Sequence, residues 1–287
     1  MIEILNNFRF LKNKRNLVLI IFFIALISVG FFILKGFTSK KTDTRLEEIP
    51  LSFDPEGPYA ILYPRRDGNA LILNIKRVST IERISYELSY QSDGIDRGVQ
   101  GKLNTEDKKS EYSQEILFGT CSKGDTFSTL HCVFDKNVEN GTLVLKIKRG
   151  NKLYIMTTLW HLQRPDLTSG IVASGDAHFN YKTNTEKEEL GLIGFTIIND
   201  LTGAPKLPEG KQVLGKVYSF NVPQTKVFPK GKLYVELADN PPIQAKIAQF
   251  VEKENRWNLL DTKIEGSKLS TSTESNGIFA VLVDSSK

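Results

Sequence analysis

The sequence predicts an all-β protein: two tandem antiparallel β-sandwich (Ig-like) domains after a single N-terminal transmembrane helix. An uncharged apolar run near the N-terminus is the first observation behind this prediction. Short runs rich in Val, Ile, Leu, Tyr and Phe then follow, separated by Gly, Asn, Asp and Pro clusters, as is typical of strands. No amphipathic stretch of helical length occurs after residue 50. Many short strands without intervening helices favour stacked antiparallel sandwiches.

The apolar run extends from Leu17 to Leu34 and contains 18 residues without a charge. As a helix it would be about 27 Å long, close to the roughly 30 Å hydrocarbon core of a bilayer. A cleaved signal peptide has a shorter apolar region and a small-residue cleavage site, whereas Phe31–Lys35 follow here. The absence of a nearby Cys also argues against a lipoprotein anchor. We therefore predict an uncleaved signal-anchor helix over residues 17–37, which contacts the lipid bilayer through Leu17 to Leu34.

The orientation of this helix is not decided by the positive-inside rule, because four Lys or Arg residues lie within about 15 residues of each end. Lys12, Lys14 and Arg15 adjoin the apolar run directly, and the tail before it is only 16 residues long. Both features favour a cytoplasmic tail, residues 1–16. The expected location is the cell membrane, with a single pass and an extracytoplasmic C-terminal body on a flexible stalk, residues 38–50.

The distribution of charge argues against a nucleic-acid partner. The chain has a formal net charge of +5. Residues 1–49 hold eight Lys and Arg against four acidic residues and so contribute +4 of it. Because the body is then nearly neutral, it has no general excess of positive charge to bind phosphates.

The body divides into a first β-sandwich domain (51–163), a linker (164–169) and a second β-sandwich domain (170–287), because 163–168 have the composition of a linker. The predicted strands of the first domain are 59–63, 70–78, 83–91, 98–103, 114–118, 142–148 and 153–160. Those of the second domain are 178–182, 190–198, 212–221, 233–237, 244–251, 256–261 and 277–283. The last of these is apolar on both faces, which suits a strand that is covered on both sides.

Three turns are expected between these strands. Pro64–Asn69 contains Asp-Gly, which favours a hairpin turn, and Arg149–Lys152 reverses the chain between two alternating strands. Asn140-Gly141-Thr142 matches a glycosylation sequon, but we interpret it as a hairpin turn before a strand.

Two groups of motifs suggest a resemblance. The first comprises Tyr86-Glu87-Leu88, the run from Glu115 to Ser122 (EILFGTCS) and Asn140-Gly141-Thr142-Leu143. It resembles uncharacterised membrane-tethered envelope proteins of bacteria. The second, Trp257–Leu260 followed by Gly277–Val281, is similar to β-sandwich modules of bacterial surface proteins. The resemblance covers about half of the chain and implies location and fold without an activity.

The two cysteines, Cys121 and Cys132, are expected to form a disulfide if the body is extracytoplasmic. It would close a short loop and restrict the unfolded chain by roughly 3 kcal/mol in the loop-entropy model. The alternative is a cysteine nucleophile, since Thr120-Cys121 resembles the strand end of sortases. That chemistry needs an upstream histidine, and the first histidine is His131. His131-Cys132 is likewise similar to part of the L,D-transpeptidase motif, but the Gly and Arg of that motif are absent.

No other chemistry is predicted. The three histidines, His131, His161 and His178, lack the spacing of metal ligands, and Asp176 near His178 is interpreted as turn chemistry. Tyr86 and Tyr90 share a strand face that could bind carbohydrate, but a core role is the better interpretation. Trp160 and Trp257 are also assigned to the core. We expect no catalytic, cofactor-binding or metal-binding residues.

The resulting hypothesis is a non-enzymatic envelope protein with a binding or structural role, whose partner is an unknown envelope protein or glycan. Two alternatives stay open: a cell-wall enzyme with a cysteine nucleophile, and an assembly component of an envelope machine.

Overall fold

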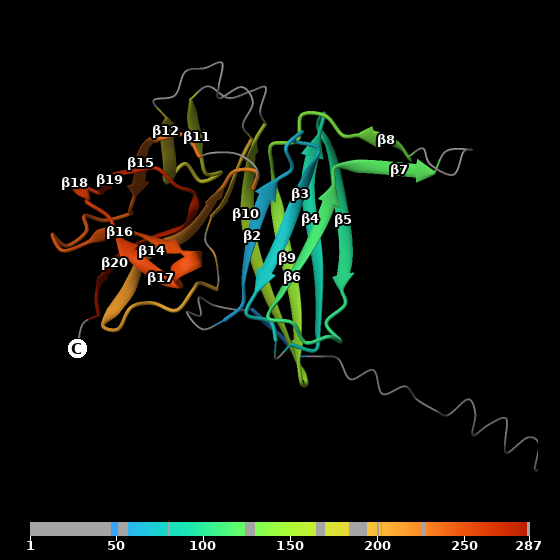
Figure 1. Ribbon diagram of the computed structural model, residues 1–287, viewed down its shortest axis with the longest axis horizontal. Helices are drawn as coiled ribbons and strands as arrows, with labels where there is room; N and C mark the ends of the chain where they lie inside the picture. The colour runs from blue at the N-terminus through green and yellow to red at the C-terminus, as the bar shows by residue number, and fades with distance from the viewer. Residues whose placement is uncertain are drawn as a thin grey trace, which may run out of the picture. The chain divides into compact units, whose positions relative to one another are not determined.

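Antiparallel β-sheets make up the body of the protein (Figure 1). The computed structural model describes residues 47–50, 57–79, 81–123, 130–164, 170–183, 194–199, 201, 203–224 and 228–285. Glu47–Lys287 form one unit, separate from Met1–Leu46. Within the described residues, no helix has the length and apolar character needed to cross a membrane. The predicted anchor, Leu17 to Leu34, lies outside them.

The strands agree with most of the predicted apolar runs. Before residue 164 they are β1 (Glu47–Pro50), β2 (Tyr59–Pro64), β3 (Ala70–Lys76), β4 (Arg83–Ser92), β5 (Ile95–Leu103), β6 (Glu111–Leu117), β7 (Gly119–Lys123), β8 (Leu130–Phe134), β9 (Asn140–Arg149) and β10 (Lys152–Gln163). After residue 170 they are β11 (Ile171–Ala173), β12 (Phe179–Thr183), β13 (Phe195–Asn199), β14 (Lys211–Asn221), β15 (Gly231–Glu236), β16 (Lys246–Val251), β17 (Arg256–Leu259), β18 (Lys263–Glu265), β19 (Lys268–Thr273) and β20 (Gly277–Asp284).

The largest sheet continues from one half of the sequence into the other. Its order is β17-β16-β20-β14-β13-β10-β9-β4-β5, with β1 beside β10. The pairing of β10 with β13, from Leu159 opposite Asn199 to Gln163 opposite Phe195, joins strands on either side of the predicted linker. The all-β prediction is confirmed. The division into two Ig-like domains stays a prediction, and the large sheet contains strands from both sides of the predicted linker.

The two halves of this sheet differ in how they are covered. In β9, Leu143, Leu145 and Ile147 are buried while the residues between them are half-buried. In β20, every residue from Ile278 to Val283 is buried, and successive side chains enter two different cores. The apolar run at the C-terminus is therefore covered on both faces, as its sequence predicts.

A three-stranded sheet, β2-β3-β6, contributes to the first core and also contacts the second half of the chain. Strand β2 lies near β13 and β14, and the buried hydroxyl of Thr196 donates a hydrogen bond to the carbonyl of Leu62. The Arg77 guanidinium likewise donates to the carbonyl of Ala204. This first core therefore contains residues from both halves of the sequence.

The second core lies between β13, β14, β16 and β20 and the five-stranded sheet β11-β12-β15-β19-β18. Aromatic rings fill it. The Phe179 ring lies 4.9 Å from that of Tyr218 and 5.9 Å from that of Phe279. Strand β19 was not predicted, because its sequence, Lys268-Leu-Ser-Thr-Ser-Thr273, is not an apolar run. Its Ser270, Thr271 and Thr273 are nevertheless buried.

Strand β1 was also not predicted, since residues 38–50 were interpreted as a flexible stalk. Glu47–Pro50 instead pair in parallel with Lys152–Ile155 at the start of β10. The four-residue strand buries little: three of its residues are exposed and Ile49 is half-buried. Backbone pairing at the free edge of β10 can order such a segment without a hydrophobic face.

Two of the expected turns are confirmed. The β2–β3 turn contains Gly68 at φ 70°, and the β9–β10 turn contains Gly150 at φ 60°. Asp93 (φ 50°) and Gly94 (φ 77°) form a further two-residue turn between β4 and β5. Positive φ at both positions is the signature of a type I′ hairpin.

Candidate functional site

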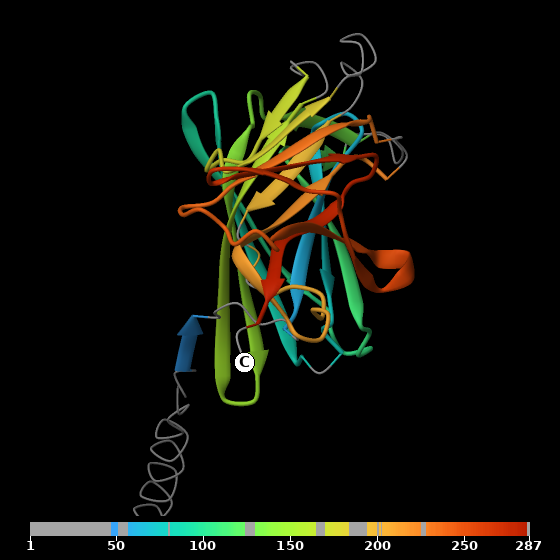
Figure 2. The same ribbon diagram turned by 90° about the vertical axis from the view of Figure 1, so that its left-hand side faces the viewer.

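Several connections gather at one end of the first half of the body, opposite to the end where β1 joins β10. Lys152 of β10 pairs with β1, whereas Gln163, at the other end of the strand, lies close to the β2–β3 turn. A 12-residue strand separates its ends by roughly 36–40 Å. We call this end, formed by the β2–β3 turn, the β4–β5 turn, the β7–β8 hairpin and residues 135–142, the loop end (Figures 1 and 2).

A disulfide-bonded hairpin extends from the loop end. Strands β7 and β8 pair only with each other among the described residues, and Cys121 lies directly opposite Cys132. The structure joins these cysteines by a disulfide, with Cα atoms 4.0 Å apart. Such a spacing suits the closer type of opposed pair in an antiparallel ladder. Residues 124–129, at the tip, lie outside the described residues.

The hairpin joins the body at Gly119 and Phe118. Gly119 has φ +122°, and a Cβ at this position would lie 2.1 Å from the Val133 carbonyl oxygen, so only glycine fits. Phe118 is fully buried, with its ring 5.9 Å from Trp160 and 5.0 Å from Tyr90. The base of the hairpin is thus fixed in the core.

Val133, in contrast, is 74% exposed on the hairpin. Cys121, Ser122 and His131 are exposed as well. The hairpin therefore has a base fixed in the core and exposed strands beyond it.

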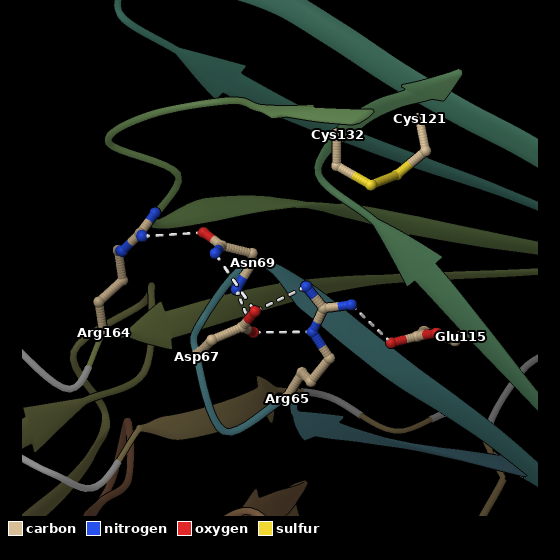
Figure 3. Close-up of polar contacts among 7 residues, drawn as sticks. All are labelled: Arg65, Asp67, Asn69, Glu115, Cys121, Cys132 and Arg164. Carbon is tan, nitrogen blue, oxygen red and sulfur yellow. Dashed lines mark hydrogen bonds and ion pairs between the residues drawn. A yellow bond between two sulfur atoms is a disulfide. The ribbon is translucent and has the colours of Figure 1, made fainter. Parts of the chain in front are cut away.

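A charged cluster fixes the β2–β3 turn beside this hairpin (Figure 3). The Arg65 guanidinium donates two hydrogen bonds of 2.7 Å to Asp67 and one of 2.9 Å to Glu115. These bonds raise the pKa of Arg65. Burial alone would raise the pKa of Asp67, but its hydrogen bonds with Arg65 and Asn69 outweigh burial, and the pKa is lowered. Arg164 donates to the Asn69 side chain at 3.2 Å. The cluster therefore links β2, β6 and the end of β10.

The same Arg65 side chain lies against the hairpin, with its guanidinium carbon 5.5 Å from the centre of the Phe134 ring. Cation–π contacts of this kind contribute about 0.5–1 kcal/mol when they are exposed. The sequence identified residues 64–69 as a turn, but it gave no sign that Arg65 pairs with Glu115, 50 residues away.

A cleft of about 780 Å³ lies on the loop end, between β4, β5, β9, β10 and the β11–β12 turn. Hydroxyl and amide side chains contribute to its lining, from Ser89, Gln91, Asn137, Asn140 and Thr142, and the exposed Leu159 adds apolar surface. Asp96, Arg97 and Glu139 add charges of both signs. The cleft therefore offers many hydrogen-bonding groups and little net charge. No local pattern in the sequence indicates this cleft, because its residues come from five separate segments.

Tyr90 and Trp160 line the cleft, but they and the nearby Tyr86 are too buried to form a stacking surface. Tyr86 is 6% exposed, Tyr90 5% and Trp160 1%. The Tyr90 hydroxyl donates to Asp135 at 2.8 Å, and burial together with this bond raises the pKa of Tyr90 to about 12. The core assignment of these residues is confirmed, as it is for Trp257 at 8% exposure.

The Asn140-Gly141-Thr142 segment is not a hairpin turn, and that prediction was wrong. Asn140 begins β9 and pairs with His161, while Gly141 lies between β4 and β10. A Cβ on Gly141 would lie 1.9 Å from the Ser89 carbonyl oxygen and 2.5 Å from the Trp160 ring. The glycine is required by this close approach of two strands. Asn140 is exposed, and its side-chain oxygen is 2.8 Å from Nδ1 of His161.

The histidines do not come together. His131 and His178 are exposed, and burial lowers the pKa of His161. Asp176 accepts hydrogen bonds from Ser174, from the His178 backbone and from Lys216, which agrees with the prediction of turn chemistry. In the part of the chain that the structure describes, no three His, Cys, Asp or Glu side chains gather where they could hold a metal ion.

Comparisons with protein-family models, with curated proteins and with solved structures find no match to this chain.

Proposed function

We propose that this chain is a membrane-tethered binding protein of the cell envelope, which presents the loop end to an extracytoplasmic protein partner. The observation that carries the proposal is the grouping of a polar cleft and a disulfide-bonded hairpin at the end opposite to β1. Because the chain enters the body at β1, a tether preceding Glu47 leaves the loop end distal to its attachment.

The chemistry of the cleft favours a protein partner over a glycan. Carbohydrate sites commonly stack sugar rings on exposed aromatic side chains, and here Tyr86, Tyr90 and Trp160 are buried. Amides, hydroxyls and charges of both signs instead suit the backbone and side chains of a polypeptide. Val133, exposed on the hairpin, offers an apolar contact at the same end of the body.

A non-enzymatic role is part of this proposal. Cys121 and Cys132 are bonded to each other, so neither sulfur is a thiolate in this state. We expect thiol labelling of the full-length protein under native, non-reducing conditions to modify neither cysteine, and labelling of both after reduction. A cysteine that reacts without reductant would favour the alternative, a cell-wall enzyme.

The tether is tested by fractionation of cells that express the full-length chain with a C-terminal tag. We expect the protein in the membrane fraction, and we expect protease added outside the cytoplasmic membrane to remove the tag. Recovery of the full-length chain in the aqueous fraction, or a mature N-terminus beyond Leu34, would overturn the anchor.

The cleft is tested by a photoreactive amino acid placed at Gln91, which is exposed and lines the cleft. We expect a crosslinked protein that is lost when Ser89→Arg fills the cleft. Ser85→Arg is the matched control, because Ser85 lies on the same face of β4 outside the cleft. Equal crosslinking in all three proteins would contradict the proposed site. Several crosslinked membrane proteins that copurify as one complex would favour an assembly component instead.

A further inference from the structure

Strand β5 is the outer edge of the large sheet and has no strand on its outer side among the described residues (Figure 1). It is nine residues long, contains no proline, and pairs with β4 without a register shift. Ile95 at its start is 56% exposed. Natural proteins usually protect such edges with prolines, bulges, very short strands or charged side chains, because a free edge can pair with another strand. Of these devices β5 has only the charges, on Asp96, Arg97 and Lys102.

The other borders of the large sheet are shorter. The opposite edge, β17, has only four residues. The free side of β10 is occupied by β1 near Lys152 and by β13 near Gln163. The edge of β5 is therefore the longest unpaired border of this sheet in the described residues.

The β4–β5 turn determines which backbone groups of β5 point outward. In a two-residue type I′ hairpin the flanking residues, Ser92 and Ile95, form a hydrogen-bonded pair. Because hydrogen-bonded and non-hydrogen-bonded pairs alternate along an antiparallel ladder, odd-numbered residues of β5 bond to β4. The N–H and C=O groups of Asp96, Gly98, Gln100 and Lys102 then point away from the sheet.

We propose that a second copy of this chain pairs with this edge, β5 against β5 in antiparallel register, across a two-fold axis at Val99. This register places Asp96 opposite Lys102 of the second copy, and Gly98 opposite Gln100. It is the only antiparallel self-pairing that uses all four outward-facing residues, with about eight backbone hydrogen bonds. The interface is isologous, as in most homodimers.

Side-chain chemistry selects the same register independently. Each Asp96 meets a Lys102 of the other copy, so two opposite-charge pairs flank the axis. Ile95 lies opposite Leu103 of the other copy, so an apolar pair stands at each end of the ladder. Gly98 has no atom other than the Leu88 carbonyl oxygen, at 3.7 Å, near its Cβ position, so a neighbouring strand meets little steric resistance there.

The pairing has two consequences for the assembly. An antiparallel ladder reverses the strand direction, so the two bodies lie antiparallel, with both their loop ends and their β1 ends at opposite ends of the dimer. Two chains anchored in one membrane would then pair with their bodies lying along its surface. Asp96 also lines the cleft, so Lys102 of the second copy lies beside that cleft. The dimer does not depend on the proposed partner, and either can fail alone.

Charge reversal tests the register. The full-length protein in detergent is measured by light scattering after size exclusion, over a range of protein concentrations. Asp96→Lys or Lys102→Asp alone creates two like-charge pairs across the axis, and we expect the dissociation constant to rise roughly tenfold. The double variant exchanges the charges, and we expect it to restore dimerisation. Glu106→Lys, an exposed residue outside β5, is the control and is expected to dimerise normally.

Proline substitution tests the edge itself. Gln100→Pro removes an N–H that points outward, and we expect it to abolish the dimer while thermal unfolding changes little. Val99→Pro removes an N–H that bonds β4, and we expect it to lower the melting temperature. A wild-type chain that is monomeric at all concentrations would overturn the proposal. So would a dimer that survives both Gln100→Pro and the single charge reversals.

Discussion

Strands β9 and β20 belong to the same sheet, yet they are covered differently. Strand β9 alternates between buried residues and half-buried residues that include Lys146 and Lys148, because only one of its faces packs on a core. Strand β20 alternates between two cores, so that Phe279 and Val281 face one and Ile278 and Ala280 face the other. Position along one sheet, rather than membership in it, therefore decides how much each residue contributes to stability.

Phe279→Ala is expected to have the largest effect. Phe279 is fully buried in the two-sided region, and its ring packs on that of Phe179. We expect the free energy of unfolding to fall by about 3–5 kcal/mol, measured by denaturant titration. Glu87→Ala on the exposed face of β4 is the control. An equal loss of unfolding free energy in Phe279→Ala and Glu87→Ala would show that burial on two faces does not make the larger contribution.

Gly141→Ala tests the one-sided region at its tightest point. The added methyl group would lie 1.9 Å from the Ser89 carbonyl oxygen, a backbone atom that cannot move alone. We expect a loss of about 3 kcal/mol by the same titration, because overpacking displaces the strands. Gly98→Ala is the control, because Gly98 also lies in a strand without a positive φ and only the Leu88 carbonyl oxygen, at 3.7 Å, lies near its Cβ position.

Three valine-to-threonine substitutions compare the faces directly. Val217 and Val281 enter opposite cores of the two-sided region, while Val144 lies on the outer face of β9. We expect Val217→Thr and Val281→Thr each to cost about 1–3 kcal/mol, since each buries a hydroxyl without a partner. Val144→Thr should change the melting temperature little. If Val144→Thr were as costly, β9 would be covered on both faces.

Asp176 connects the two layers of the second core through Lys216, at 3.0 Å. Burial opposes ionisation of Asp176, but hydrogen bonds from Ser174 and Lys216 prevail and lower its pKa. Its contribution to stability is therefore present at neutral pH and is lost as the pH falls through that lowered pKa. We expect Asp176→Asn to unfold with a weaker dependence on acid pH than the wild type. Identical pH profiles would exclude this role.

The Lys146–Glu87 pair is expected to have the smallest effect. The two side chains are 33% and 49% exposed, on the outer face of β9 and β4. An exposed pair of this kind contributes about 0.2–1 kcal/mol. A double-mutant cycle with Lys146→Ala and Glu87→Ala measures the coupling, which should weaken further in high salt.

The sequence predicted those parts of the fold that depend on local pattern. The alternation in 142–148 and the continuous apolar run in 277–283 led to the correct strands. A strand that is buried on one face alternates apolar and polar residues, and a strand that is buried on both faces is apolar throughout. Strand β19 was missed because its buried positions are Ser and Thr. The Asp93-Gly94 turn carried a recognisable hairpin signal that the sequence analysis did not use.

The loop end was harder to predict, because its residues are distant in sequence. The Cys121–Cys132 pairing followed from there being two nearby cysteines. The cleft and the Arg65–Glu115 contact depend on which strands become neighbours, and no local pattern records this. Asn140-Gly141 was misinterpreted for the same reason. A glycine is needed at position 141 because Ser89 and Trp160 pack closely against it, and both lie far from it in the sequence.

The parallel pairing of β1 with β10 has a mechanical consequence. A force that pulls the chain before Glu47 away from the body, along the axis of β10, shears the four register positions from Glu47–Lys152 to Pro50–Ile155 together instead of peeling them one at a time. Resistance to such a load is governed by the rate at which the whole ladder ruptures. If a pulling force acts between the loop end and the chain before Glu47, the β1–β10 ladder would carry that force while the two hydrophobic cores stay intact.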